Sequence, residues 1–134
     1  MKNINKSGNV KGSLKVEGNL ILMDNLIVEE EIEVEGYIDC AGYSIEAGGS
    51  IEAGGSIKAG GSIEAGGWIK AGDWIKAGGS ILAQLWIKTK TTITAGLYIY
   101  AGVKTWSKLE DGDDAIECTE LKGEIRHGTL KKLT

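Results

Sequence analysis

The chain contains no proline, no phenylalanine and a single histidine, His127. One imidazole cannot supply the histidine cluster of a catalytic metal site, and no phosphate-binding loop, nucleophile elbow or Cys-x-x-Cys motif is present. The two cysteines, Cys40 and Cys118, are too few for a disulfide framework. We therefore expect a protein that is not an enzyme and that uses no metal and no cofactor.

Long apolar runs are also missing. The sequence has neither the roughly 18 consecutive apolar residues of a membrane helix nor the shorter apolar stretch of a signal peptide. The formal net charge of −4 is mildly acidic, which disfavours a dedicated nucleic-acid binder. We expect a protein partner, no membrane and a cytoplasmic location, in a bacterium or in a phage-infected host cell.

Glycine, in contrast, is abundant and regularly placed. From Ser44 to Gly102 an isoleucine recurs every six residues and is followed two residues later by alanine or, once, by Thr89. The isoleucines of this period are Ile45, Ile51, Ile57, Ile63, Ile69, Ile75, Ile81, Ile87, Ile93 and Ile99. Residues two apart in an extended strand face the same side, so isoleucine and alanine point inward together. The glycines that follow turn the chain, and their density, with the six-residue period, excludes a helix.

Strands and corners at a period of six are typical of a triangular parallel β-helix, a solenoid of hexapeptide-like repeats. Three edges make one coil of about 18 residues, so residues that far apart stack at roughly 4.8 Å. Ile45, Ile63, Ile81 and Ile99 then form one inward column, and the remaining isoleucines form two more. The same step extends back to Leu14, with one extra residue between Cys40 and Ile45 that we interpret as a corner insertion. The sequence predicts an all-β fold of about five coils.

The repeat ends after Gly102. We therefore divide the chain into a β-helix over residues 1–102 and a C-terminal segment over residues 103–134. An open coil end has unpaired strand edges that need cover. We expect the C-terminal segment to cap the last coil or to pair two chains, and the coil ends offer a second route to a homo-oligomer.

Outward charges divide the repeat into two halves. Between Glu17 and Glu52 there are ten acidic residues and no Lys or Arg, whereas Lys58 to Lys90 contains five lysines against Glu64 and Asp73. We take Glu31, Glu33 and Glu52 as representatives of the acidic face. The arrangement serves either solubility alone or a dipolar surface that steers a charged partner.

Tryptophans appear where the basic half begins. The 18-residue register stacks Trp68 beneath Trp86, and Trp74 lies on the adjacent face. Exposed tryptophan beside lysine is typical of interaction surfaces. The alternative is a ladder that only stabilises the coil, or a surface that the C-terminal segment covers. The predicted partner-binding residues are Trp68, Trp74, Trp86, Lys70, Lys76 and Lys88.

The run GSLKVEGNLILMDNLIVEEEIEVEGYI, followed by the Ile-x-Ala-Gly steps, resembles the repeat of bactofilins, the polymer-forming cytoskeletal proteins. That resemblance implies a right-handed triangular β-helix and end-to-end polymerisation. The regular step also resembles left-handed acyltransferase coils, so both hands stay open at this point. The long C-terminal segment and the tryptophan-bearing wall depart from bactofilins.

Three functions follow from these features. The first is a non-catalytic β-helical protein that presents a rigid Trp/Lys surface to a protein partner. The second is a phage-type inhibitor of a nucleic-acid enzyme, anti-CRISPR-like, whose acidic wall mimics DNA. The third is a polymer-forming scaffold.

Overall fold

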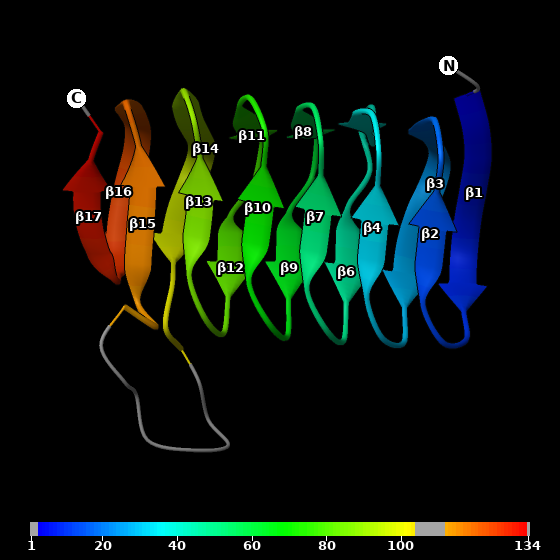
Figure 1. The fold of residues 1–134 in the computed structure, drawn as a ribbon, viewed down its shortest axis with the longest axis horizontal. Coiled ribbons are helices and arrows are strands. Elements are labelled where there is room, and N and C mark those ends of the chain that lie inside the picture. Colours follow the sequence, from blue (N-terminus) through cyan, green and yellow to red (C-terminus); the bar gives the residue numbers. More distant parts are fainter. Residues whose placement is uncertain (1–2, 104–111, 134) are drawn as a thin grey trace.

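The computed structural model describes residues 3–103 and 112–133. Within these residues the chain is all-β and winds into a parallel β-solenoid, with its two ends at opposite ends of the long axis (Figure 1). The predicted fold class is therefore confirmed. No helix in the described ranges has the length and apolarity that a membrane span requires.

Most strands are three residues long and begin at an isoleucine of the repeat. The described strands are β1 (Asn3–Val10), β2 (Leu14–Val16), β3 (Asn19–Val28), β4 (Ile32–Val34), β5 (Ile38–Asp39), β6 (Ile45–Ala47), β7 (Ile51–Ala53), β8 (Ile57–Ala59), β9 (Ile63–Ala65), β10 (Ile69–Ala71), β11 (Ile75–Ala77), β12 (Ile81–Ala83), β13 (Ile87–Thr89), β14 (Thr92–Tyr100), β15 (Ala115–Cys118), β16 (Glu120–His127) and β17 (Thr129–Lys132). Each short strand is followed by a corner, which glycine makes in most coils.

The strands of the described residues form two sheets that cover three faces. A seven-stranded sheet, β2-β4-β7-β10-β13-β15-β17, makes the first face. The other sheet has ten strands, and its long strands β1, β3, β14 and β16 pass around a corner and so join the second and third faces. In Figure 1 the strands at the front run upward and the chain returns downward behind them. Successive coils advance from right to left, so the solenoid is right-handed.

The core consists of three inward columns, as the period predicts. Ile51, Ile69 and Ile87 are register partners on the first face and are all fully buried. The other two columns pair in the same way, at Ile57–Ile75–Ile93 and at Ile45–Ile63–Ile81–Ile99. Burying each isoleucine side chain stabilises the fold by about 1.5–3 kcal/mol.

The extra residue near Cys40 is a corner insertion, as predicted. Ile38 pairs with Ile57, a step of 19 residues, whereas the next coil pairs Ile57 with Ile75, a step of 18. Ala41 takes up the insertion with a left-handed backbone (φ 46°), and its N–H donates to the Asp39 carboxylate at 2.9 Å. The insertion shifts the sequence register while the stacking of the columns continues.

The described part of the C-terminal segment continues the same sheets. β15 pairs in parallel with β13, β16 with β14 and β17 with β15. Residues 104–111 and 134 of the predicted segment lie outside the described residues. β1 and β2 are edge strands at one end of the axis, and β16 and β17 are edge strands at the other. That residues 103–134 cap the coil or pair two chains stays a prediction.

Both cysteines are fully buried and free. Burial, followed by the charge of Asp39, raises the pKa of the Cys40 thiol to about 12, and burial also raises the pKa of Cys118. The unfolded Cys40 thiol ionises near pH 9 and the folded one near pH 12, so its stabilisation is present below pH 9 and is lost as the pH rises toward 12. We expect the free energy of unfolding to fall by up to about 1.4 kcal/mol per pH unit for Cys40 in this window, and the raised pKa of Cys118 acts in the same direction. Urea unfolding at several pH values measures the slope.

The matched control for that slope is Cys40→Ala, because alanine occupies the equivalent inward position in most coils. Its slope above pH 9 should be shallower than that of the parent chain. Equal slopes in the two proteins would show that Cys40 is not held neutral by the fold.

Candidate partner-binding faces

At several positions a serine of one coil holds the residue that precedes the strand of the next coil. The N–H of Trp68 donates to the Ser50 hydroxyl at 3.1 Å, and the N–H of Tyr98 donates to the Ser80 hydroxyl at 3.2 Å. Serine suits this position because its short hydroxyl reaches a backbone N–H that points along the axis. Trp68 and Tyr98 therefore start from fixed backbone positions.

Trp68 and Trp86 form a parallel stack on the first face. Their ring centroids lie 4.8 Å apart at an interplanar angle of 3°. This stack follows from the register, because Ile69 pairs with Ile87 and each tryptophan immediately precedes its isoleucine. Both indoles are half-buried, so each keeps part of its surface available to a partner.

Lysines border the stacked indoles. Lys70 and Lys88 are register partners, and the Lys88 ammonium lies 4.4 Å from the centroid of the Trp86 ring. Lys88 also pairs with Glu117 of β15 at 3.1 Å. Both side chains of this ion pair are partly exposed, so it contributes at most about 1 kcal/mol. We call Trp68, Trp86, Lys70 and Lys88 the tryptophan wall.

Two predicted partner-binding residues lie elsewhere. Trp74 precedes β11 and Lys76 lies within it, and β11 pairs with β8 and β14 on the second face. The structure thus brings four of the six residues together and places the other two around a corner, where the 18-residue register puts them.

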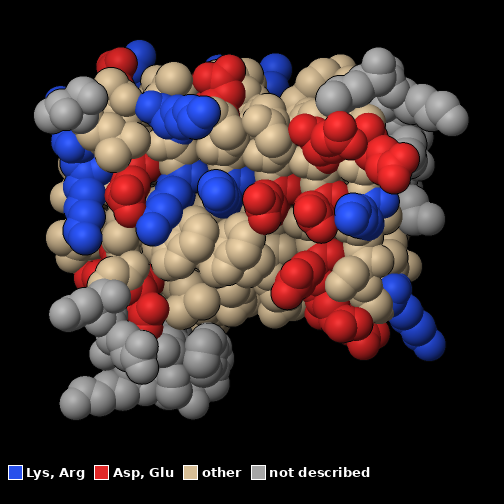
Figure 2. All heavy atoms as spheres, in the orientation of Figure 1, with Lys and Arg blue, Asp and Glu red and all other residues tan. Residues whose placement is uncertain are grey.

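The acidic residues predicted from sequence share the first face with the tryptophan wall. Glu33 and Glu52 are register partners, and Glu31 immediately precedes β4. Glu52 is in turn the register partner of Lys70. Figure 2 shows this face, with acidic side chains gathered toward one end of it and lysines beside them. One continuous face therefore carries both the acidic surface and the tryptophan wall.

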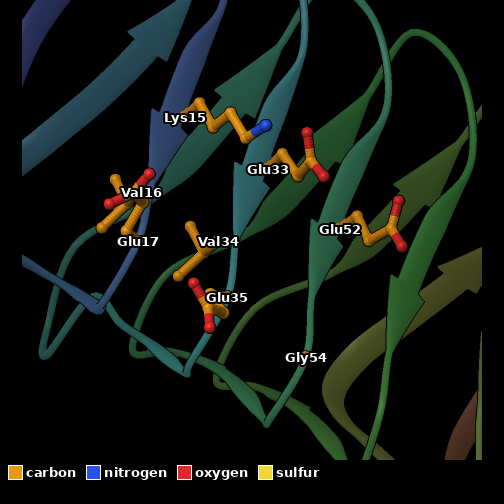
Figure 3. Close-up of a pocket in the computed structure, with 8 residues that line it drawn as sticks. All are labelled: Lys15, Val16, Glu17, Glu33, Val34, Glu35, Glu52 and Gly54. Carbon is orange, nitrogen blue, oxygen red and sulfur yellow. The ribbon is translucent and has the colours of Figure 1, made fainter. Parts of the chain in front are cut away.

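A shallow cavity of about 260 Å³ lies on the acidic part of this face (Figure 3). Four carboxylates and one ammonium surround it. Its lining residues are Lys15, Val16, Glu17, Glu33, Val34, Glu35, Glu52 and Gly54. We call this group the acidic hollow.

Three features that involve candidate functional side chains were not predicted from the sequence. Glu117 holds Lys88, and the step Ile116-Glu117-Cys118 repeats the inward–outward–inward pattern, which indicates a strand but not its partner. Arg126 lies 4.0 Å from the Tyr98 ring centroid and 2.5 Å from a carboxylate oxygen of Glu124. No repeat step signals the Arg126 contact. The third feature is the row Tyr37, Ser56 and Trp74 on the second face, where Tyr37 and Trp74 lie two coils apart with the small Ser56 between them.

Comparison with protein-family models, with curated proteins and with solved structures finds no match. The stacked parallel coils confirm the β-helix that the repeat predicts, whereas membership of the bactofilins stays a prediction. We therefore infer function from the geometry of the faces.

Proposed function

We propose that this protein is a non-catalytic interaction protein that presents the tryptophan wall to a protein partner. The observation that carries this proposal is the parallel stack of Trp68 and Trp86, flanked by lysines, on the flat face of a regular sheet. A β-solenoid is compatible with an interaction or scaffold role, and tryptophan is strongly enriched at the energetic centres of protein interfaces.

The solenoid supports such a role because it fixes the side chains before binding. The backbone of each coil is hydrogen-bonded to the coils on both sides, as in Ile69 N–H to Trp86 O at 3.0 Å and Ile51 N–H to Trp68 O at 2.9 Å. Side chains on such a grid lose little conformational freedom when a partner docks, and that saving strengthens binding.

The charges around the wall indicate the partner's chemistry. Lys88 is occupied by Glu117, but Lys70 makes no ion pair among the described residues. A partner with an apolar centre and an acidic group at its rim would match the indoles and Lys70 together. We therefore expect contact dominated by burial of the indoles, with weak dependence on salt.

The acidic hollow favours a second candidate function. Glu33 on β4 and Glu52 on β7 are register partners at about the 4.8 Å spacing of a sheet, and Glu17 and Glu35 immediately follow β2 and β4. Lys15 is the one residue of opposite charge that lines the cavity. Carboxylates gathered on a rigid sheet suit a decoy for the DNA-binding channel of a nucleic-acid enzyme. Binding of that kind would weaken steeply as salt rises.

Affinity capture from the native cells separates the two candidates. The baits are the parent chain, Trp68→Ser/Trp86→Ser and the triple variant Glu31→Lys/Glu33→Lys/Glu52→Lys, each compared at low and high salt. We expect the partner to be retained by the parent chain and the triple variant, and its affinity to fall at least about tenfold for the tryptophan variant.

The control bait is Leu97→Ser, since Leu97 is an apolar residue 56% exposed outside the wall. It should bind like the parent chain. Loss of the partner with the triple variant and with high salt, but not with the tryptophan variant, would replace the first candidate by the second. Retention by all four baits would remove both.

A further inference from the structure

Trp74 belongs to a row of outward residues, one from each of three successive coils, in which two aromatic residues flank a serine. Tyr37, Ser56 and Trp74 each immediately precede a strand, and the strands pair in register at Ile38–Ile57–Ile75. The small Ser56 therefore lies between two aromatic residues that are two coils apart. Along the axis of the solenoid the two aromatic rings are therefore separated by the space above the small Ser56 side chain.

The gap matches the thickness of one stacked ring. Two coil steps separate Tyr37 from Trp74, which is about 9.6 Å at the usual strand spacing. On the neighbouring face, two tryptophans one coil apart stack with centroids 4.8 Å from each other. A planar ring placed beside Ser56 would lie one such step from each neighbour, within the range of about 4.5–7 Å that aromatic pairs prefer.

A cavity of about 300 Å³ occupies this gap, and its lining residues are Tyr37, Ile38, Asp39, Ser56, Lys58 and Trp74. The hydroxyls of Ser44, Ser50, Ser62 and Ser80 each accept an N–H from the next coil. The hydroxyl of Ser56 makes no such bond among the described residues, and it borders the cavity instead. We call this cavity the aromatic slot.

Polar groups at the edge of the slot indicate which chemical groups a ligand would carry beside its aromatic ring. Asp39 and Lys58 are register partners, so a carboxylate and an ammonium lie side by side at the edge of the slot. A second cavity of about 270 Å³ adjoins the slot: Lys58 and Trp74 line both cavities, and Lys76 lines the second one alone. Neither Lys58 nor Lys76 makes an ion pair among the described residues, so two ammonium groups beside Trp74 remain available to an anion.

We propose that the aromatic slot binds a planar aromatic anion of the size of a nucleoside monophosphate. The ring lies between Tyr37 and Trp74, the ring edge hydrogen-bonds to the Ser56 hydroxyl and the Asp39 carboxylate, and the phosphate lies against Lys58 and Lys76. This site is on a different face from the tryptophan wall and does not depend on the proposed protein partner.

The test is a titration of the full chain with adenosine monophosphate, followed through the indole N–H resonances in NMR spectra. Each resonance is assigned from a single tryptophan-to-tyrosine variant. We expect the Trp74 resonance to shift with saturation while the resonances of Trp68 and Trp86 stay in place. Adenosine should bind about tenfold more weakly, because it lacks the charge that meets the two lysines.

The decisive pair of variants is Ser56→Trp and Ser56→Ala. Tryptophan at position 56 fills the slot with a permanent ring, so binding should be lost and the melting temperature should rise. Alanine leaves the slot open and should weaken binding only a few-fold. Trp74→Ser removes one wall of the slot, should weaken binding about tenfold or more, and serves if Ser56→Trp does not fold.

Three results would overturn this proposal. One is that inorganic phosphate alone shifts the Trp74 resonance as much as adenosine monophosphate does, which would show that only the two surface lysines bind the ligand. Another is unchanged binding in a folded Ser56→Trp variant or in Trp74→Ser. The third is that a tryptophan-containing peptide shifts the Trp74 resonance whereas adenosine monophosphate does not, which would make the slot part of a protein interface.

Discussion

Replacing Gly66 by alanine should destabilise the native state by about 3 kcal/mol or more. A Cβ atom on Gly66 would lie 2.0 Å from the carbonyl oxygen of Gly48 and 2.8 Å from its carbonyl carbon. Both of these are backbone atoms of the coil below, so no side chain can move aside. The Gly66 N–H also donates to the Ala47 carbonyl at 2.9 Å, and opening the corner would strain that bond. Urea unfolding followed by circular dichroism measures the loss.

Gly42→Ala is the matched control for this substitution. A Cβ atom on Gly42 would meet nothing within 4 Å. Alanine restricts the unfolded chain more than glycine does, so the variant should be as stable as the parent or slightly more stable. Equal losses at positions 42 and 66 would show that the corners do not stack as closely as the structure has them.

Replacing Ile69 by alanine should cost about 2–5 kcal/mol of unfolding free energy. Ile69 is fully buried and has Ile51 on one side and Ile87 on the other in its column. The narrow core has no other side chain that can fill the space, because the coil of Ile69 and the coils on both sides turn only one isoleucine inward on each edge, with alanine or threonine two positions later. The cavity therefore persists and adds its cost to the lost burial.

The neighbouring outward residue provides the control for Ile69. Lys70→Ala removes an exposed side chain from the same strand and should change stability by less than about 0.5 kcal/mol. The pair is compared by chemical denaturation under one set of conditions. If the two variants lose similar stability, the inward and outward assignments on β10 are wrong.

The coil could be predicted from sequence because one physical rule repeats along residues 14–102 with a single interruption. An inward Ile and Ala two residues apart, followed by a corner, recur often enough to fix the columns and to expose the single insertion near Cys40. Beyond Gly102 the pairing steps become irregular: Ile87 pairs with Ile116 and then Ile116 pairs with Leu130. Steps of 29 and 14 residues carry no period, so the sequence could not place β15 to β17.

The candidate sites also divide into features that follow from the regular repeat and features that depend on irregular steps. The stack of Trp68 on Trp86 was predictable because each residue precedes a repeat isoleucine and the two lie one regular step of 18 residues apart. The Lys88–Glu117 ion pair spans one of the irregular steps and therefore needed the structure. The aromatic slot spans the insertion, so Tyr37 and Trp74 align only when the 19-residue step from Ile38 to Ile57 is counted.

Oxidative footprinting of the tryptophans tests whether the tryptophan wall is the partner-binding face. The captured complex and the free chain are exposed to hydroxyl radicals, and oxidation of each indole is measured by mass spectrometry. Trp74 serves as the internal reference because it lies on another face. We expect the partner to protect Trp68 and Trp86 and to leave the oxidation of Trp74 unchanged. Protection of Trp74 alone, or of no tryptophan, would contradict it.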